Sequence, residues 1–242
     1  MQSRFCVDFV TLRQYGNKFK MTYFKFPVKN SDSETKKIHN HNYNNYDEKL
    51  DNSLSRSKSA VFELALCNPW EYFVTLTLDS TKYDRYNLSK FRKDLSQFIR
   101  NYNRLHMCSI KYLLIPEQHK DGAWHMHGLF HNVPESALSI NKNGYKDWKA
   151  YSEKFGFCSV DMVRDSEKVS SYITKYISKD LSDRKTELNA HLYYASKGLK
   201  RSDILYKGAV LNADSLKWDF ENDYVKIKWG YSSDFSSVQF YD

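Results

Sequence analysis

Two histidines and a glutamate form the first group of residues in this chain that could do chemistry. His125 and His127 stand two apart in an apolar run, and residues at that spacing on a β-strand point to the same face. Glu117 lies on a preceding run that a short turn would fold back beside them. Two nitrogens and one oxygen leave open coordination positions, so this group could hold Mg²⁺ or Mn²⁺ and still accept phosphate oxygens. A plain surface role for Glu117 is an open alternative.

The spacing of the histidine pair is not specific by itself. His39 and His41 repeat it in an Asn-rich segment without a strand pattern, and we interpret that pair as part of a solvated loop. The pair at His125 differs because apolar residues flank it. Its meaning therefore depends on the residues that surround it.

Two tyrosines form the second candidate group. If one helix carries Tyr172 and Tyr176, their i and i+4 positions place both phenols on one face, and Lys175 and Lys179 repeat the same offset. A phenol with a pKa near ~10 is a poor nucleophile at neutral pH, so neighbouring ammonium groups and a metal-bound phosphate would help to form the phenolate. The alternative is a half-buried aromatic stripe covered by lysine stems.

The elements that must position these residues follow from hydrophobic spacing. The middle of the chain predicts a strand, an amphipathic helix and a hairpin, then another strand in CSVDMVR and a second helix with Ser166 as its N-cap. In the same order, leaving out the CSVDMVR strand, we expect these elements at Tyr72–Leu78, Leu88–Leu105, Ile110–Gln118 with Ala123–Val133, and Ser166–Leu181. Lys120-Asp121-Gly122 predicts the turn of the hairpin.

The ends of the chain have weaker patterns. Two β-prone runs about Gly16-Asn17 predict an N-terminal hairpin, and the Asn-rich stretch from Lys29 to about Asn52 predicts a loop or linker. A helical run follows and ends at Asn68-Pro69. The polar, aromatic insertion at 141–157 and the C-terminal tail, with its short strands or loops, could not be placed in a fold.

Composition narrows the classes of function. Lys and Arg number 37 against 29 Asp and Glu, and the net charge of +8 suits a polyanionic partner, although solubility alone also explains it. The chain has 19 Tyr, 15 Phe and 5 Trp, and some of these rings could stack on unpaired bases. The four cysteines form no CxxC pair, which favours a reducing cytoplasm. We expect no membrane span, no signal peptide and, without a phosphate-loop motif, no nucleotide cofactor.

Three segments, in this order, resemble the three motifs of HUH endonucleases: YFVTLTLD at 72–79, WHMHGLF at 124–130 and YITKYISK at 172–179. They are most similar to the two-tyrosine initiators of rolling-circle replication in plasmids and small single-stranded DNA phages. The trio is specific and covers about residues 70 to 181. The resemblance implies an α+β fold with a central antiparallel five-stranded sheet, ferredoxin-like or RRM-like, and helices on its faces. We therefore divide the chain into an N-terminal hairpin and linker (1–54), an HUH endonuclease domain (55–181) and a C-terminal extension packed on that domain (182–242).

The resemblance also implies residue roles. It makes Glu117, His125 and His127 the ligands of Mg²⁺ or Mn²⁺ and Tyr172 the principal nucleophile, with Tyr176 available for a second transfer. Lys175 would orient metal-bound water or the phosphate, and we group Lys179 with it as catalytic. We further expect DNA contacts from Thr75, Thr77, Arg164 and Lys168, although core packing of the two threonines is an open alternative.

The implied reaction is attack of a tyrosine on single-stranded origin DNA, which leaves a 5′-phosphotyrosine and a free 3′-hydroxyl for a host polymerase. Strand separation would come from a host helicase. Two alternatives are open: an HUH transposase or relaxase, and a non-catalytic DNA-binding protein with a structural metal. The first would cleave transposon ends or a transfer origin, whereas the second would bind zinc and not cut.

Overall fold

The computed structural model describes residues 9–25, 46–142, 144–179, 191–211, 213 and 216–240. The chain divides into two compact units. One comprises residues 43–200, and the other joins residues 1–42 to residues 201–242. We call these the central unit and the two-ended unit.

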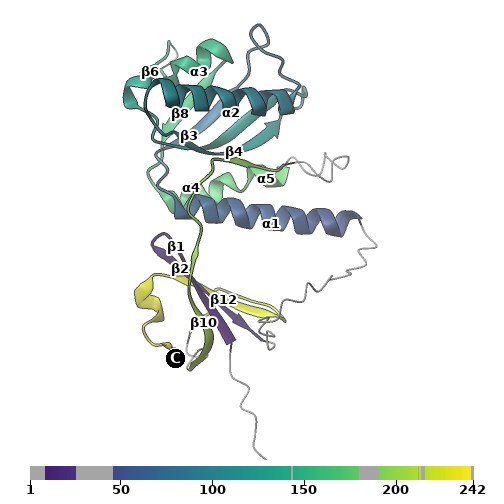
Figure 1. Cartoon of the computed structure of the whole chain (residues 1–242). Helices are drawn as coiled ribbons and strands as arrows, with labels where there is room; N and C mark the ends of the chain where they lie inside the picture. Colours follow the sequence, from purple (N-terminus) through teal and green to yellow (C-terminus); the bar gives the residue numbers. More distant parts are fainter. Residues whose placement is uncertain are drawn as a thin grey trace, which may run out of the picture. The chain divides into compact units, whose positions relative to one another are not determined.

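A five-stranded antiparallel sheet forms the centre of the central unit (Figure 1). β5 (Trp124–His131) lies between β3 (Tyr72–Thr77) and β4 (Lys111–Gln118), with β8 (Cys158–Met162) and β9 (Tyr194–Ala195) at the two edges. The candidate histidines therefore lie on the middle strand. The expected α+β fold with a five-stranded antiparallel sheet is confirmed.

One face of this sheet packs on α2 (Leu88–Leu105) and α3 (Lys149–Lys154). Alternate residues of β3 point to this side, where Val74 and Leu76 are fully buried. α2 supplies Phe91 and Leu95 from one stripe of the helix, as its amphipathic spacing predicted. Met126, the residue between the two histidines, is also buried on this side.

The other face packs on α1 (Tyr46–Cys67), α4 (Ser166–Ile173) and α5 (Tyr176–Lys179), which Figure 1 shows on the opposite side of the sheet from α2. Leu113 and Leu129 of the sheet meet Ile173 and Ile177 in this second core. The two isoleucines hold α4 and α5 against the strands. The tyrosine segment is thus fixed over the face that carries the histidines.

The tyrosine segment is two short helices, so the prediction of one helix over Ser166–Leu181 was wrong. The N–H of Lys175 donates to the carbonyl of Tyr172 at 3.1 Å, which is an i to i−3 bond, and the hydroxyl of Thr174 donates to the carbonyl of Ser171 at 2.8 Å. Such local bonds compete with the α-helical ladder. Residues 180–181 lie outside the described residues.

Two other local expectations need correction. Asp165, not Ser166, caps α4, because its carboxylate accepts from the backbone N–H groups of Glu167 and Lys168 at 3.0 Å. The segment expected to be a linker as far as Asn52 is already helical from Tyr46. His39 and His41 lie outside the described residues.

The insertion that the sequence left unplaced has its own small structure. A 3₁₀ turn, η1 (Glu135–Ala137), leads into β6 (Leu138–Ile140), which pairs with β7 (Lys146–Trp148) before α3 begins. Trp148 and Tyr151 from this segment are fully buried in the core beside α2. These aromatic residues belong to the core, which is the plain alternative for the chain's high aromatic content.

The two-ended unit is a second sheet built from both ends of the chain. The hairpin of β1 (Phe9–Tyr15) and β2 (Lys18–Phe24) turns at Gly16, whose φ is +62°, as predicted. β10 (Asp203–Leu211) pairs with β1, and β12 (Val225–Gly230) pairs with β2. Edge pairing adds β11 (Phe220–Glu221) and β13 (Gln239–Phe240), and a 3₁₀ turn, η3 (Ser232–Phe235), follows β12.

Val10, Leu12 and Met21 form the core of this sheet with Val210 and Phe235. Residues far apart in sequence therefore share one core, and these units divide the chain differently from the ranges 1–54, 55–181 and 182–242. Part of the last range, β9, joins the sheet of the central unit instead. Among the described residues, no helix is both long and apolar enough to cross a membrane.

Candidate active site

The register of the central sheet brings the candidate metal ligands to one face. Glu117 of β4 and Thr77 of β3 both lie directly opposite His125, and Thr75 lies opposite His127. Directly opposed residues in antiparallel strands point to the same side. These side chains therefore lie on the face that α4 and α5 cover.

A threonine hydroxyl lies against each imidazole. Oγ1 of Thr77 is 3.0 Å from Nδ1 of His125, and Oγ1 of Thr75 is 3.2 Å from Nδ1 of His127. A histidine whose Nδ1 hydrogen is held in this way presents the lone pair of Nε2. Both threonines, expected to contact DNA, are thus placed to orient the histidines.

Glu117 completes the group through a short contact. Its Oε2 lies 2.7 Å from Nε2 of His127. That nitrogen is buried and makes no hydrogen bond of proper geometry in the described part of the chain. We give more weight to the short distance, which shows that the carboxylate and the imidazole are close enough to share one positively charged partner.

The histidines are held in the form that binds metals. Burial, aided by the nearby His119 and His127, lowers the pKa of His125 to about 4. Burial also lowers the pKa of His127, against the opposing effect of Glu117. Neutral imidazole, the metal-binding form, is therefore favoured at neutral pH.

Sequence reasoning missed His119. Its ring stacks on that of His125, with 3.7 Å between centroids and 10° between planes. The available signal was its position two residues beyond Glu117, which continues the same alternation as His125 and His127. His119 therefore belongs to the same surface.

The two tyrosines meet the histidines at this face. The hydroxyl oxygens of Tyr172 and Tyr176 lie 2.8 Å apart, although the residues stand on two separate helices. The ring of Tyr176 stacks on His127 with 4.1 Å between centroids. Phe73 packs against both tyrosines, at 5.5 Å and 6.3 Å. The metal-ligand candidates and the nucleophile candidates, distant in sequence, form one cluster.

The two phenols have different surroundings. Burial raises the pKa of Tyr176, and its hydrogen bond with Tyr172 raises it further. Tyr172 is 45% exposed, and Nζ of Lys175 lies 5.5 Å from the centre of its ring. The side chain of Lys179 lies outside the described residues. Tyr172 is therefore the phenol that a DNA strand can reach most easily.

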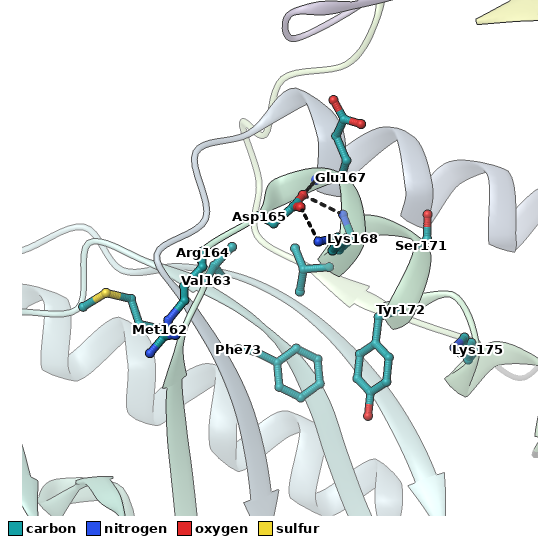
Figure 2. Close-up of a pocket in the computed structure, with 11 residues that line it drawn as sticks. Phe73, Met162, Val163, Arg164, Asp165, Glu167, Lys168, Ser171, Tyr172 and Lys175 are labelled. Atoms are coloured by element: carbon teal, nitrogen blue, oxygen red, sulfur yellow. Dashed lines mark hydrogen bonds and ion pairs between the residues drawn. The ribbon is translucent and has the colours of Figure 1, made fainter.

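A pocket of about 660 Å³ opens beside Tyr172. Figure 2 shows the rings of Phe73 and Tyr172 next to each other beneath α4, with Asp165 and Lys168 at the start of that helix. Arg164 and Lys175 also line the pocket. Lys168, which is largely exposed, forms an ion pair with Asp165 at 3.4 Å. Both cations expected to contact DNA thus lie beside the candidate nucleophile.

The donor set suits a divalent cation in its chemistry. Two neutral imidazoles and one carboxylate on adjacent strands leave coordination positions open, and the buried Nε2 of His127 lacks a hydrogen-bond partner of proper geometry. In the described residues, however, no three His, Cys, Asp or Glu side chains are grouped closely enough to hold an ion as they stand. The contact between Glu117 and His127 would have to open for an ion to enter.

Comparison with known families identifies a match to the central unit. Residues 71–181 match the family of replication-associated proteins named for ORF2 and the gene 2 protein. The match starts one residue before β3 and includes the hairpin and both tyrosine helices. It supports a rolling-circle replication initiator. No curated protein and no solved structure matches the chain.

Proposed function

We propose that this protein starts rolling-circle replication by nicking and rejoining single-stranded origin DNA through a tyrosine nucleophile. The observation that carries the proposal is the contact between the tyrosine pair and the histidine face, where Tyr176 stacks on His127 and bonds to Tyr172. A purely structural aromatic stripe would not need to place both hydroxyls at a cluster of neutral imidazoles. The match to replication-associated proteins points to the same role.

In the proposed reaction, the phenolate oxygen of Tyr172 attacks the scissile phosphorus. A bond forms between this oxygen and phosphorus as the bond from phosphorus to the 3′ oxygen breaks. The proton lost by the phenol balances the proton gained by the leaving 3′ oxygen. The products are a 5′-phosphotyrosine and a free 3′-hydroxyl, which a host polymerase would extend after a host helicase separates the strands.

The protein supplies position and charge for this step. Lys175, beside the ring of Tyr172, favours the phenolate and faces the phosphate, while Arg164 and Lys168 receive the neighbouring backbone at the pocket. Glu117, His125 and His127 would hold Mg²⁺ or Mn²⁺, which when bound would supply Lewis-acid polarisation of the phosphate.

The two tyrosines take different roles in this proposal. Tyr172 acts first because it is exposed and lines the pocket. Tyr176, half-buried against His127, can make a second transfer because its oxygen lies 2.8 Å from that of Tyr172. Rejoining then needs only a small shift of the strand between the two hydroxyls.

The decisive experiment traps the covalent adduct. The purified chain is incubated with single-stranded origin oligonucleotides and Mn²⁺, and SDS-stable protein-DNA adducts are counted. We expect adducts with the wild type, a large loss with Tyr172→Phe and none with the Tyr172→Phe, Tyr176→Phe double variant. Tyr145→Phe is a matched control, since Tyr145 is 55% exposed and lies outside the site. Adducts that persist in the double variant would disprove the mechanism.

The same assay separates the alternatives. Cleavage of transposon hairpin ends or a transfer origin, but not of a replication origin, would indicate a transposase or relaxase. Tight zinc binding without any cutting would indicate a non-catalytic DNA-binding protein.

A further inference from the structure

The sheet of the two-ended unit carries a row of cationic and aromatic side chains that its own core does not explain. Arg13 of β1 lies directly opposite Lys20 of β2, and Lys20 lies directly opposite Trp229 of β12. The three therefore share one face of the sheet. The core residues Leu12 and Met21 are neighbours of this row in sequence and point to the other face.

The two cations stand together without a carboxylate. In the part of the chain that the structure describes, Arg13 makes a hydrogen bond to the hydroxyl of Ser202 at 3.3 Å, Lys20 lies 5.5 Å from the centre of the Trp229 ring, and neither forms an ion pair. Burial lowers the pKa of Lys20, and the charge of Arg13 lowers it further. Two like charges at this distance repel, so an anion between them would be stabilising.

Lysines elsewhere on the same sheet behave differently. Lys228 forms an ion pair with Asp219 at 3.3 Å, and Lys25 and Lys226 both pair with Glu221. The chain thus provides acidic partners for these cations, whereas among the described residues Arg13 and Lys20 have none. That contrast indicates a binding surface rather than general surface charge.

Aromatic rings accompany the uncompensated charges. Tyr15 lies two residues after Arg13 on the same face, and its ring contacts that of Trp229 with 5.0 Å between centroids and a tilt of 57°. Cations beside aromatic faces are the arrangement by which proteins hold single strands, because phosphates bind the cations while unpaired bases stack on the rings. A duplex keeps its bases stacked inside and cannot use the rings in this way.

We propose that the row formed by Arg13, Lys20, Trp229 and Tyr15 is a second binding surface for single-stranded DNA. Two phosphates of the strand contact Arg13 and Lys20, and a base stacks on Trp229 or Tyr15. This surface belongs to the two-ended unit and involves none of the residues of the tyrosine and histidine cluster. It would hold origin DNA that flanks the nick, and it does not depend on cleavage chemistry.

The test measures binding of the full-length protein to a fluorescent oligo(dT) strand by anisotropy, in EDTA, over a series of salt concentrations. For Arg13→Gln, Lys20→Gln we expect affinity to fall about tenfold. The slope of log affinity against log salt should fall by about 1.4, or ~0.7 for each phosphate that the variant no longer binds. Trp229→Leu should weaken binding several-fold without a change in slope, because stacking releases no counterions.

The matched control is Lys226→Gln, Lys228→Gln, which removes the same charge from lysines that have acidic partners. We expect it to bind as the wild type does. Thermal unfolding of each variant checks that the sheet is intact. Equal losses in the two double variants, an unchanged salt slope in Arg13→Gln, Lys20→Gln, or a loss of duplex binding as large as the loss of oligo(dT) binding would overturn the proposal.

Failure of the nuclease proposal would look different. Tyr172→Phe should bind oligo(dT) as the wild type does, and Arg13→Gln, Lys20→Gln should still form adducts on a short, saturating origin oligonucleotide. The two proposals can therefore succeed or fail separately.

Discussion

At the scale of single residues, the site depends on how the imidazoles are held. Each imidazole bonds to a threonine on β3, and burial keeps both in the neutral form. Partners that orient metal-binding histidines typically change metal affinity by roughly 10- to 100-fold when removed. The threonines should therefore affect the metal step more than the fold.

The first prediction follows from these bonds. Thr75→Val and Thr77→Val each keep the β-branched shape but lose the hydroxyl, so we expect Mn²⁺ to bind about tenfold more weakly. Half-saturation of adduct formation by Mn²⁺ measures the change. Thr22→Val, on the sheet of the two-ended unit, should leave it unaltered; the same shift in all three variants would contradict the assigned role.

The second prediction concerns pH. Because the folded pKa of His125 lies near 4, below its ordinary value of 6.5, the unfolded chain takes up a proton that the folded chain does not between these values. Stability contributed by His125 is therefore fully present above about pH 6.5 and is lost as the pH falls towards 4. We expect thermal unfolding in EDTA to shift down over this window, and His125→Gln to show a smaller shift. An identical pH dependence in both proteins would contradict this assignment.

At the scale of elements, the strands and helices of the central unit were largely predictable. α2 begins and ends where its apolar stripe indicated, and the turn before β5 lies at Gly122, whose φ is +84°. The break between α4 and α5 was not predictable, because the hydroxyl of Thr174 and a local 3₁₀ bond decide it, and neither alters the hydrophobic spacing. His119 was missed for a related reason: it lies beyond the last hydrogen-bonded residue of β4.

The third prediction concerns the strand that carries the histidines. A Cβ at Gly128 would stand 2.2 Å from the carbonyl oxygen of Leu113 and 2.6 Å from Cδ2 of Leu114. Gly128→Ala should therefore force β4 and β5 apart and lower the free energy of unfolding by about 1–3 kcal/mol. Urea denaturation measures it. At Gly144 a Cβ meets nothing within 4 Å, so Gly144→Ala, which carries only the strain of its positive φ, should cost less.

The fourth prediction belongs to α4. Asp165 accepts two backbone N–H groups at the start of this helix and also lines the pocket beside Tyr172. Asp165→Ala should destabilise the start of α4 and reduce adduct formation, whereas Asp165→Asn keeps an acceptor for the cap. Because Asp165→Asn also removes a negative charge next to the proposed DNA path, it should bind single strands at least as well as the wild type. Equal losses of adduct in both variants would show that the charge matters rather than the cap.

At the scale of the whole molecule, the pairing of the two chain ends was beyond sequence reasoning. Hydrophobic alternation shows that β1, β2 and β12 are strands, but it carries no information about which strand pairs with which. The pairing of Phe9 with Ala209 joins residues that are distant in the chain, and no local pattern marks it. The C-terminal tail therefore could not be placed until the sheet was seen.

The fifth prediction tests this dependence. A chain ending at Lys200 loses β10 and β12, the strands on both sides of the β1–β2 hairpin, and exposes Val10 and Met21, which are fully buried. An isolated two-stranded hairpin is marginally stable at best in water, so hydrogen exchange should show loss of amide protection over residues 9–24. The strands β3, β4 and β5 keep all their partners and should stay protected. Persistent protection of β1 and β2 in the shortened chain would mean that the hairpin is stabilised from elsewhere, and simultaneous loss in β3 to β5 would mean that the two units do not fold independently.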